Sequence, residues 1–186
     1  MELFLSLLLG VSLSAATGFR IFVPPLVMSV AAQGGHLELS PGFGWMATQP
    51  ALIMFAAATV LEVGAYYVPW VDELLDVIAS PVAVVAGILA TASVTGEMSP
   101  LVQWSLAILA GGTAAGLVQG ATDVVRLTST IATGGVANPA VSTVELVSSI
   151  GLTLLAIALP LLTGILVVGL LVYAGTRLRG VLRRRA

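Results

Sequence analysis

Several residue types are missing or scarce in this chain of 186 residues. It has no cysteine, no lysine and a single histidine, and only 9% of its residues are charged. Without cysteine, disulfides, iron–sulfur clusters and thiolate metal sites are excluded. The one histidine, His36, stands in a polar, glycine-flanked stretch, and a zinc site needs three or four ligands. We therefore expect no metal and no cofactor.

The scarcity of charge also restricts the class of protein. A soluble domain has roughly 25% charged residues, whereas 58% of this chain is hydrophobic and its mean hydropathy is +1.09. All seven cations are arginines, and five of them lie at the C-terminus, so no basic surface remains to bind nucleic acid. The composition excludes an ordinary cytosolic enzyme and predicts an integral membrane protein surrounded by membrane lipid.

Hydrophobic runs predict an all-α polytopic membrane protein with six transmembrane helices. Pro24-Pro25 interrupts the first run, and the start of the chain lacks the cationic region of a signal peptide, so we expect a retained first span. The whole chain, residues 1–186, is then a single transmembrane domain. The six runs cover residues 3–32, 50–68, 71–95, 101–132, 140–159 and 161–179.

Charge in the loops predicts the orientation, because arginine favours the cytoplasmic side of a membrane. The C-terminal arginines place that end of the chain in the cytoplasm, and six crossings place the N-terminus there too. Arg126, at the inner end of the fourth run, agrees with this orientation. The five C-terminal arginines are Arg177, Arg179, Arg183, Arg184 and Arg185.

The two halves of the chain, residues 1–95 and 101–182, show a similar pattern. In each half a stripe of small residues is followed by a glycine pair, a Pro-Ala pair, an apolar run and a proline. Three-span repeats must have opposite orientations, so we predict two inverted three-helix repeats, an architecture found in many transporters. The alternative is six helices with a chance glycine pattern. The stripes are Gly10, Ser14 and Gly18, and Gly112, Gly116 and Gly120.

Small residues at every fourth position let another helix approach closely, since lipid supplies no hydrophobic drive for association. We expect the two stripes to pack the first and fourth runs together or to form a homodimer. A pore lining is the less favoured alternative.

Arg20 is a candidate functional residue because it lies inside the first run, four residues before Pro24-Pro25. An arginine in the membrane costs about 3 kcal/mol on insertion scales, so it normally pairs or contacts water. Prolines break the helix here, and broken helices hold the sites of many transporters. Alternatively, Arg20 ends a span and extends to the lipid head groups.

The fourth run carries the second set of candidates. Asp123 and Arg126 are three residues apart and can pair locally. When the two stripes are aligned, Asp123 falls next to Arg20, so we predict an Arg20–Asp123 contact between the halves, either a gate or a structural clamp. Further hydrogen-bonding groups nearby are Thr17, Gln119 and Thr122.

Two carboxyl groups lie in other runs. Glu62, in the second run, has no charged neighbour within a turn, which makes it a candidate proton or cation ligand; the alternative is a neutral, hydrogen-bonded glutamic acid. Ser142 followed by Glu145 matches a capping box, so we expect Glu145 to stabilise the start of the fifth helix. No metalloprotease motif, nucleophile elbow or phosphate loop is found, and we expect no enzyme; an enzyme acting on lipid is a distant alternative.

Three stretches carry a family resemblance: residues 14–20 (SAATGFR), residues 62–72 with Glu62 and Pro69-Trp70-Val71-Asp72, and residues 133–145 with TGGVANP, Ser142 and Glu145. Together they resemble a bacterial integral-membrane family catalogued as domain of unknown function 4126. The resemblance covers nearly the whole chain and implies a multi-pass protein of the bacterial inner membrane. It implies no activity.

The function expected from the sequence is transport or channel conduction of an unidentified small solute or ion between the repeats. Arg20 and Asp123 form the expected central pair, with Glu62 as proton or cation partner and Arg126 at the inner mouth. The candidate residues include both arginines and acids, so they favour proton coupling or a zwitterionic substrate no more than an anion. The alternative is a non-transporting membrane scaffold or assembly protein, held together by the glycine stripes and the ion pair.

Overall fold

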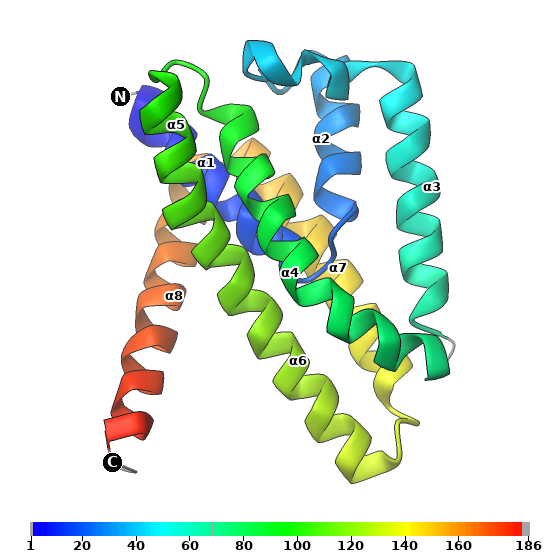
Figure 1. Cartoon of the computed structure of the whole chain (residues 1–186). Helices are drawn as coiled ribbons and strands as arrows, with labels where there is room; N and C mark the ends of the chain where they lie inside the picture. The colour runs from blue at the N-terminus through cyan, green and yellow to red at the C-terminus, as the bar shows by residue number, and fades with distance from the viewer. Residues whose placement is uncertain (1, 68, 184–186) are drawn as a thin grey trace.

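The structure is a computed structural model; it describes residues 2–67 and 69–183, without the side chains of 69–77 and 177–183. The described residues are mainly helical, joined by short turns and loops, and contain no strand (Figure 1). The helices are α1 (Glu2–Thr17), α2 (Val23–Gln33), η1 (Pro41–Ala47), α3 (Gln49–Ala65), α4 (Pro69–Val94), α5 (Pro100–Leu106), η2 (Ala107–Gly112), α6 (Thr113–Thr133), α7 (Asn138–Ala158) and α8 (Pro160–Arg183).

Five of the six predicted runs correspond to one helix each. The second run corresponds to α3 (Gln49–Ala65), the third to α4 (Pro69–Val94), the fifth to α7 (Asn138–Ala158) and the sixth to α8 (Pro160–Arg183). Residues 101–132 form a continuous 34-residue helix of α5, η2 and α6, in which η2 is a π-helical segment. Prolines near the first position begin α3, α5 and α7, because a proline's missing N–H is not needed there.

The first run differs, because α1 and α2 form a hairpin instead of one crossing helix (Figure 1). Leu13 of α1 and Met28 of α2 share a core cluster with Ala90, near the upper end of α4. Ile21, at the turn between them, packs in a cluster with Ala83, lower on α4. The chain therefore enters the bundle, leaves the helix over residues 18–22 and returns to the end where it started. We call this element the α1–α2 hairpin and residues 18–22 its tip.

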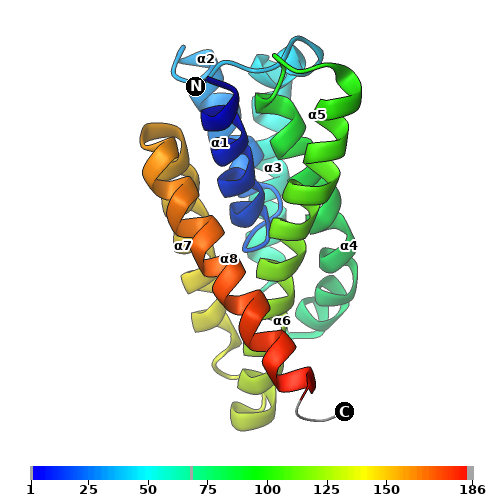
Figure 2. The same ribbon diagram turned by 90° about the vertical axis from the view of Figure 1, so that its left-hand side faces the viewer.

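The hairpin corrects the predicted topology. The N-terminal end of α1 and the C-terminal end of α8 lie at opposite ends of the bundle (Figures 1 and 2), whereas six crossings would place them at the same end. The first run is long enough to cross, but its helix ends at Thr17, and Pro24 and Pro25 lie in the first turn of a new helix. The side chains of the C-terminal arginines lie outside the described residues.

Within the described residues, two helices are long and apolar enough to cross a membrane: Pro100–Thr133 and Asn138–Ala158. The pair η1 and α3, bent by 69°, makes a third if counted as one span. Large apolar side chains stand exposed on the outside of the bundle, among them Leu101 (79%) and Ile131 (78%). Such a surface suits lipid and not water.

The small residues of α1 bring its backbone close to two other helices. A Cβ added at Gly18 would lie 2.6 Å from the carbonyl oxygen of Ala115 in α6. At Gly10 an added Cβ would lie 3.1 Å from the Cα of Thr91 in α4. Contacts this close leave no space for a side chain, so α1 packs tightly between α4 and α6.

The second stripe packs mainly on α4. An added Cβ at Gly112 would lie 3.1 Å from Ile88, and one at Gly116 would lie 3.2 Å from Val84. Gly120 has nothing within 4 Å of the same position. Most residues of both stripes pack against α4. The direct approach of the two stripes that we expected is therefore limited to the contact of Gly18 with α6.

Candidate functional site at the tip of the hairpin

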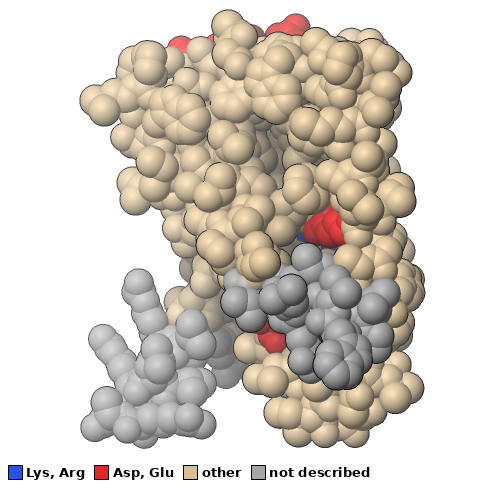
Figure 3. Space-filling view, turned by 45° about the vertical axis from the view of Figure 1, so that its right-hand side comes forward, with Lys and Arg blue, Asp and Glu red and all other residues tan. Residues whose placement is uncertain are grey.

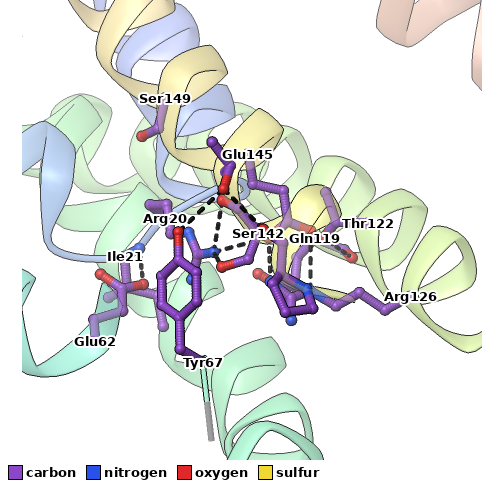
Figure 4. A network of polar contacts seen from close by, with 12 residues as sticks. Arg20, Ile21, Glu62, Tyr67, Gln119, Thr122, Arg126, Ser142, Glu145 and Ser149 are labelled. Atoms are coloured by element: carbon purple, nitrogen blue, oxygen red, sulfur yellow. Dashed lines mark hydrogen bonds and ion pairs between the residues drawn. The ribbon is translucent and has the colours of Figure 1, made fainter. Parts of the chain in front are cut away.

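The tip of the α1–α2 hairpin is anchored by Glu62 of α3 (Figure 4). One carboxylate oxygen accepts the backbone N–H of Ile21 at 2.8 Å, and the other accepts that of Phe22 at 3.0 Å. These N–H groups immediately precede the first residue of α2, Val23, and a carboxylate at a helix N-terminus suits the helix dipole. Glu62, buried with 8% exposure, therefore holds the start of the returning helix in place.

Arg20 extends from the same tip to α7. Its Nη2 donates to the carbonyl oxygen of Ser142 at 2.9 Å, donates to Ser142 Oγ, and lies 3.3 Å from Glu145 Oε2. Ser142 and Glu145 are three residues apart on α7 and therefore face the same side. The arginine connects the hairpin to α7 at the level where α1 ends.

Arg126 of α6 binds the same carboxylate from another direction. Its Nε donates to Glu145 Oε1 at 3.0 Å, and its Nη2 donates to Glu145 Oε2. A bidentate contact of this kind is the strong form of an arginine–carboxylate pair. One carboxylate therefore lies between two guanidinium groups from different parts of the chain.

Tyr66 completes the cluster. The guanidinium carbons of Arg20 and Arg126 each lie 4.1 Å from the centroid of its ring. The ring face attracts cations most strongly where water is excluded. Tyr66 thus stabilises two like charges that would otherwise repel each other. We call Arg20, Tyr66, Arg126, Ser142 and Glu145 the tip cluster.

The tip cluster is closed to solvent. The side chains of Arg20, Arg126 and Glu145 are 0%, 4% and 5% exposed. All contacts of Arg20 with Ser142 and Glu145 use one nitrogen, and its Nε and Nη1 are buried without a hydrogen-bond partner. Leaving donors of a charged group unused in the interior is unfavourable, so Arg20 is held in place with unused binding capacity.

Two cavities flank the cluster. One, of about 480 Å³, lies between α3 and α4 and is lined by Ile21, Glu62 and Tyr66 among mainly apolar residues. The other, of about 440 Å³, lies between α6 and α7 and is lined by Phe19 and Glu145 among mainly apolar residues. Figure 3 shows acidic and basic atoms at the bottom of a hollow on one face. Each cavity is lined by a residue adjacent to Arg20 in the chain: Ile21 in the first cavity and Phe19 in the second.

Comparison with known proteins identifies the family. The family model described as domain of unknown function (DUF4126) matches residues 7–179. The chain belongs to this family. No curated protein and no solved structure matches the sequence. In this DUF4126 protein, residues from each of the three stretches that carry the resemblance meet at the tip of the hairpin: Arg20 from the first, Glu62 from the second, and Ser142 and Glu145 from the third.

The predicted Arg20–Asp123 contact is wrong for this DUF4126 chain. Asp123 accepts hydrogen bonds from Ser80 Oγ of α4 and from Gln119 Nε2 of α6, both at 2.8 Å, and Arg20 pairs with Glu145. The prediction assumed that the glycine stripes face each other along their length, whereas α4 lies against both. Arg126, which was expected to pair locally with Asp123, binds Glu145 of α7.

The other predicted residues have mixed outcomes. Arg20 does not extend to head groups, since it is 1% exposed. The Thr17 hydroxyl lies within hydrogen-bond distance of the carbonyl oxygens of Ser14 in its own helix and, at 3.5 Å, of Ala83 in α4. Thr122 donates to the carbonyl oxygen of Gln119, within its own helix. Among the residues whose side chains the structure describes, no three acids or histidines lie together in a group that could hold a metal ion.

Glu145 and Ser142 were assigned to a helix start by the sequence, and this assignment is wrong. Helix α7 begins at Asn138, so both lie inside it, with their side chains in the tip cluster. A signal was present in the sequence. The buried residues of α7 include a polar stripe at intervals of three or four: Asn138, Ser142, Glu145, Ser149 and Thr153. Such a stripe in an apolar helix indicates a buried polar interface.

Proposed function

We propose that the protein is a multi-pass membrane protein with five crossings and one re-entrant hairpin. The crossings are α3, α4, the continuous helix α5–α6, α7 and α8, and the hairpin is α1–α2. Arginines at the C-terminus favour a cytoplasmic end for α8, which places the N-terminus on the opposite side. Glu145 lies seven residues after the start of α7, or about 10 Å along the helix, so the tip cluster is nearer the cytoplasmic face.

We further propose that the protein transports or conducts a small solute past the hairpin tip. One observation carries this proposal: a buried arginine with unused donors lies on an unwound segment, between two cavities. Non-helical backbone at membrane depth is tolerated where it is buried in protein or lines a water-filled cavity, and transporters build their binding sites from such breaks. A purely structural break needs no charge, yet this one carries Arg20.

The proposal changes the roles expected from the sequence. Arg20 remains the central residue, and Glu145 replaces Asp123 as its partner. Glu62 anchors the hairpin, and both of its oxygens are occupied by backbone N–H groups. An inverted repeat is proposed only for the helix pairs α3–α4 and α7–α8, since the segments that precede these pairs differ in topology.

A non-transporting scaffold is the second candidate, and one observation favours it. Every charged side chain of the tip cluster is at most 5% exposed, and buried ion pairs can determine which helices pack together without any ligand. In that case the cluster only connects α1, α6 and α7.

Cysteine labelling distinguishes the two candidates, because the chain has no natural cysteine. Single cysteines are placed at Phe19 and Val144, which line the cavity between α6 and α7, and treated with a membrane-impermeant thiol reagent from each side. Transport predicts labelling at both positions. A cysteine at Leu166, exposed on the outside of α8 and facing lipid, remains unlabelled. If Phe19 and Val144 also remain unlabelled from both sides, the scaffold is correct.

A flux measurement tests the role of Arg20 directly. In proteoliposomes, Arg20→Ala should abolish solute movement while the protein still purifies as a folded monodisperse species. The scaffold predicts loss of assembly or stability instead, with no flux in the unsubstituted protein.

A further inference from the structure

We propose that the space between α3 and α4 is a binding site for one acyl chain of a bilayer phospholipid. The site consists of two cavities that share Ile21, Phe22 and Val82: the cavity of about 480 Å³ described above and one of about 190 Å³ that reaches η1. We call the two together the α3–α4 cavity. The inference rests on the membrane crossings of α3 and α4 proposed above and does not require transport. A chain at this position closes the α3 side of the hairpin tip to water and leaves the cavity between α6 and α7 for a solute.

The lining of the α3–α4 cavity favours a hydrocarbon ligand. The described residues that line its part next to η1 are all apolar or aromatic, and its deep wall includes the core residues Met28, Phe55 and Ala90. Among the described residues that line the other part, Glu62 is the one with a charge, and both of its oxygens accept backbone N–H groups of the hairpin. Apolar cavities of this kind stay dry and bind apolar ligands.

The α3–α4 cavity is continuous with the outer surface of the bundle. Leu61 of α3 and Val82 and Val85 of α4 line the cavity, and their side chains are also between 37% and 72% exposed. The outer surface on which they stand is apolar and suits lipid. A lipid chain can therefore enter the cavity sideways from the bilayer without passing through water.

The length of the α3–α4 cavity matches one acyl chain. Phe55 and Tyr66 line its two parts from the same face of α3, eleven residues apart, which is about 16 Å along the helix. The hydrocarbon of one leaflet is about 15 Å thick, half that of a bilayer, so one chain extends about as far. A helix from a second copy is about 10–12 Å across, too thick for the narrow part of the cavity. An empty cavity would forfeit dispersion contacts along both helices, and a chain restores them.

Native mass spectrometry of the full chain in detergent tests the inference, with palmitoyl-oleoyl phosphatidylcholine as the probe and dihexanoyl phosphatidylcholine as its short-chain match. The protein should retain one copy of the long-chain lipid and should lose the short-chain lipid, although both have the same head group. Ala58→Phe places a ring inside the cavity, so the lipid-bound fraction should fall roughly tenfold, because overpacking an occupied space has a cost of that order. Ala57→Phe, exposed on the same helix and outside the lining of the cavity, should retain the lipid as the unsubstituted protein does.

Cysteine labelling tests the same cavity in the bilayer. Val82→Cys should resist a membrane-impermeant thiol reagent from both sides, because a lipid chain and not water fills the cavity. Val136→Cys, in an exposed turn, should react with the same reagent. Labelling of Val82→Cys would show a water-filled cavity and overturn the inference.

The remaining outcomes also separate the possibilities. If Ala58→Phe does not fold, Ala58→Leu replaces it and should also weaken lipid retention. The inference is overturned if the unsubstituted protein retains no lipid, if Ala58→Phe retains the lipid as Ala57→Phe does, or if Ala58→Phe loses a second copy of the chain instead of a lipid. Lipid retention without flux would overturn transport alone, and flux without lipid retention would overturn the acyl-chain site alone.

Discussion

At the residue scale, three charged side chains meet in one buried cluster. Arg20, Arg126 and Glu145 come from three separate helices or turns and are each nearly inaccessible to solvent. Separately, each would be costly in lipid or in a dry interior; together, their charges and hydrogen bonds compensate one another. Removing a single member should therefore have a much larger effect than its number of contacts suggests.

The substitution Ser142→Ala tests how much a single hydroxyl of the tip cluster contributes to stability. The substitution removes an acceptor from Arg20 Nη2 while keeping the backbone acceptor, so we expect a loss of about 1–3 kcal/mol in the free energy of unfolding. Denaturant unfolding in detergent measures it. Ser148→Ala, on the same helix and outside the cluster, should change stability by at most about 0.5 kcal/mol. Equal effects at the two positions would contradict a special role for the cluster.

Only part of the tip cluster could be predicted from the sequence, because sequence spacing describes each helix separately. Arg20 could be recognised because a charge inside an apolar run is conspicuous. Glu145 could not be distinguished from a cap, because Ser142 stands three residues before it and the start of α7 was placed too late. A pairing between distant residues such as Arg20 and Glu145 depends on how helices pack, which the spacing within each helix does not determine.

At the element scale, the hairpin depends on two different interactions: a carboxylate at its tip and glycines along its first helix. The end of each hydrophobic run was predictable from composition. The reversal was not, because residues 3–32 are apolar enough to cross a membrane as one broken helix. What distinguishes a kink from a reversal is the contact of Glu62 with the N–H groups of Ile21 and Phe22, and this contact joins parts of the chain far apart in sequence.

Glu62→Ala should loosen the tip. Without the carboxylate, the amides of Ile21 and Phe22 lose their acceptor, so their hydrogen exchange should accelerate and the protein should lose about 1–2 kcal/mol of stability. Hydrogen exchange followed by mass spectrometry measures the first effect. Amides in the middle of α7 should remain protected to the same extent as before. Unchanged exchange at the tip would show that Glu62 does not anchor it.

Two glycines provide a matched pair for helix packing. Gly18→Ala places a methyl group 2.6 Å from the Ala115 carbonyl oxygen, so α1 must move away from α6, at a cost of about 1–3 kcal/mol. Gly120→Ala introduces the same atom where nothing lies within 4 Å, and alanine favours a helix, so stability should stay equal or rise. Melting temperatures of the two variants compare them directly, and similar losses would exclude close packing as the cause.

At the scale of the whole molecule, the hairpin determines the number of crossings and hence the side of each terminus. A first run that crosses the membrane and a first run that turns back both place the turn at Glu97 on the same side. They differ only in the position of the N-terminus: a crossing puts it on the side opposite Glu97, and a hairpin puts it on the same side. The N-terminus is therefore the informative position for a topology experiment.

Single cysteines at Glu2, Glu97 and Val136 decide between the two arrangements. Val136, 83% exposed, lies in the turn between α6 and α7, at the end of the bundle opposite Glu97. An impermeant reagent applied to intact cells should label Glu2→Cys and Glu97→Cys alike and should reach Val136→Cys only after the membrane is permeabilised. Labelling of Glu2→Cys together with Val136→Cys would restore six crossings. Arg20 would then lie within a crossing helix, and the proposed transport site at a re-entrant tip would lose its structural basis.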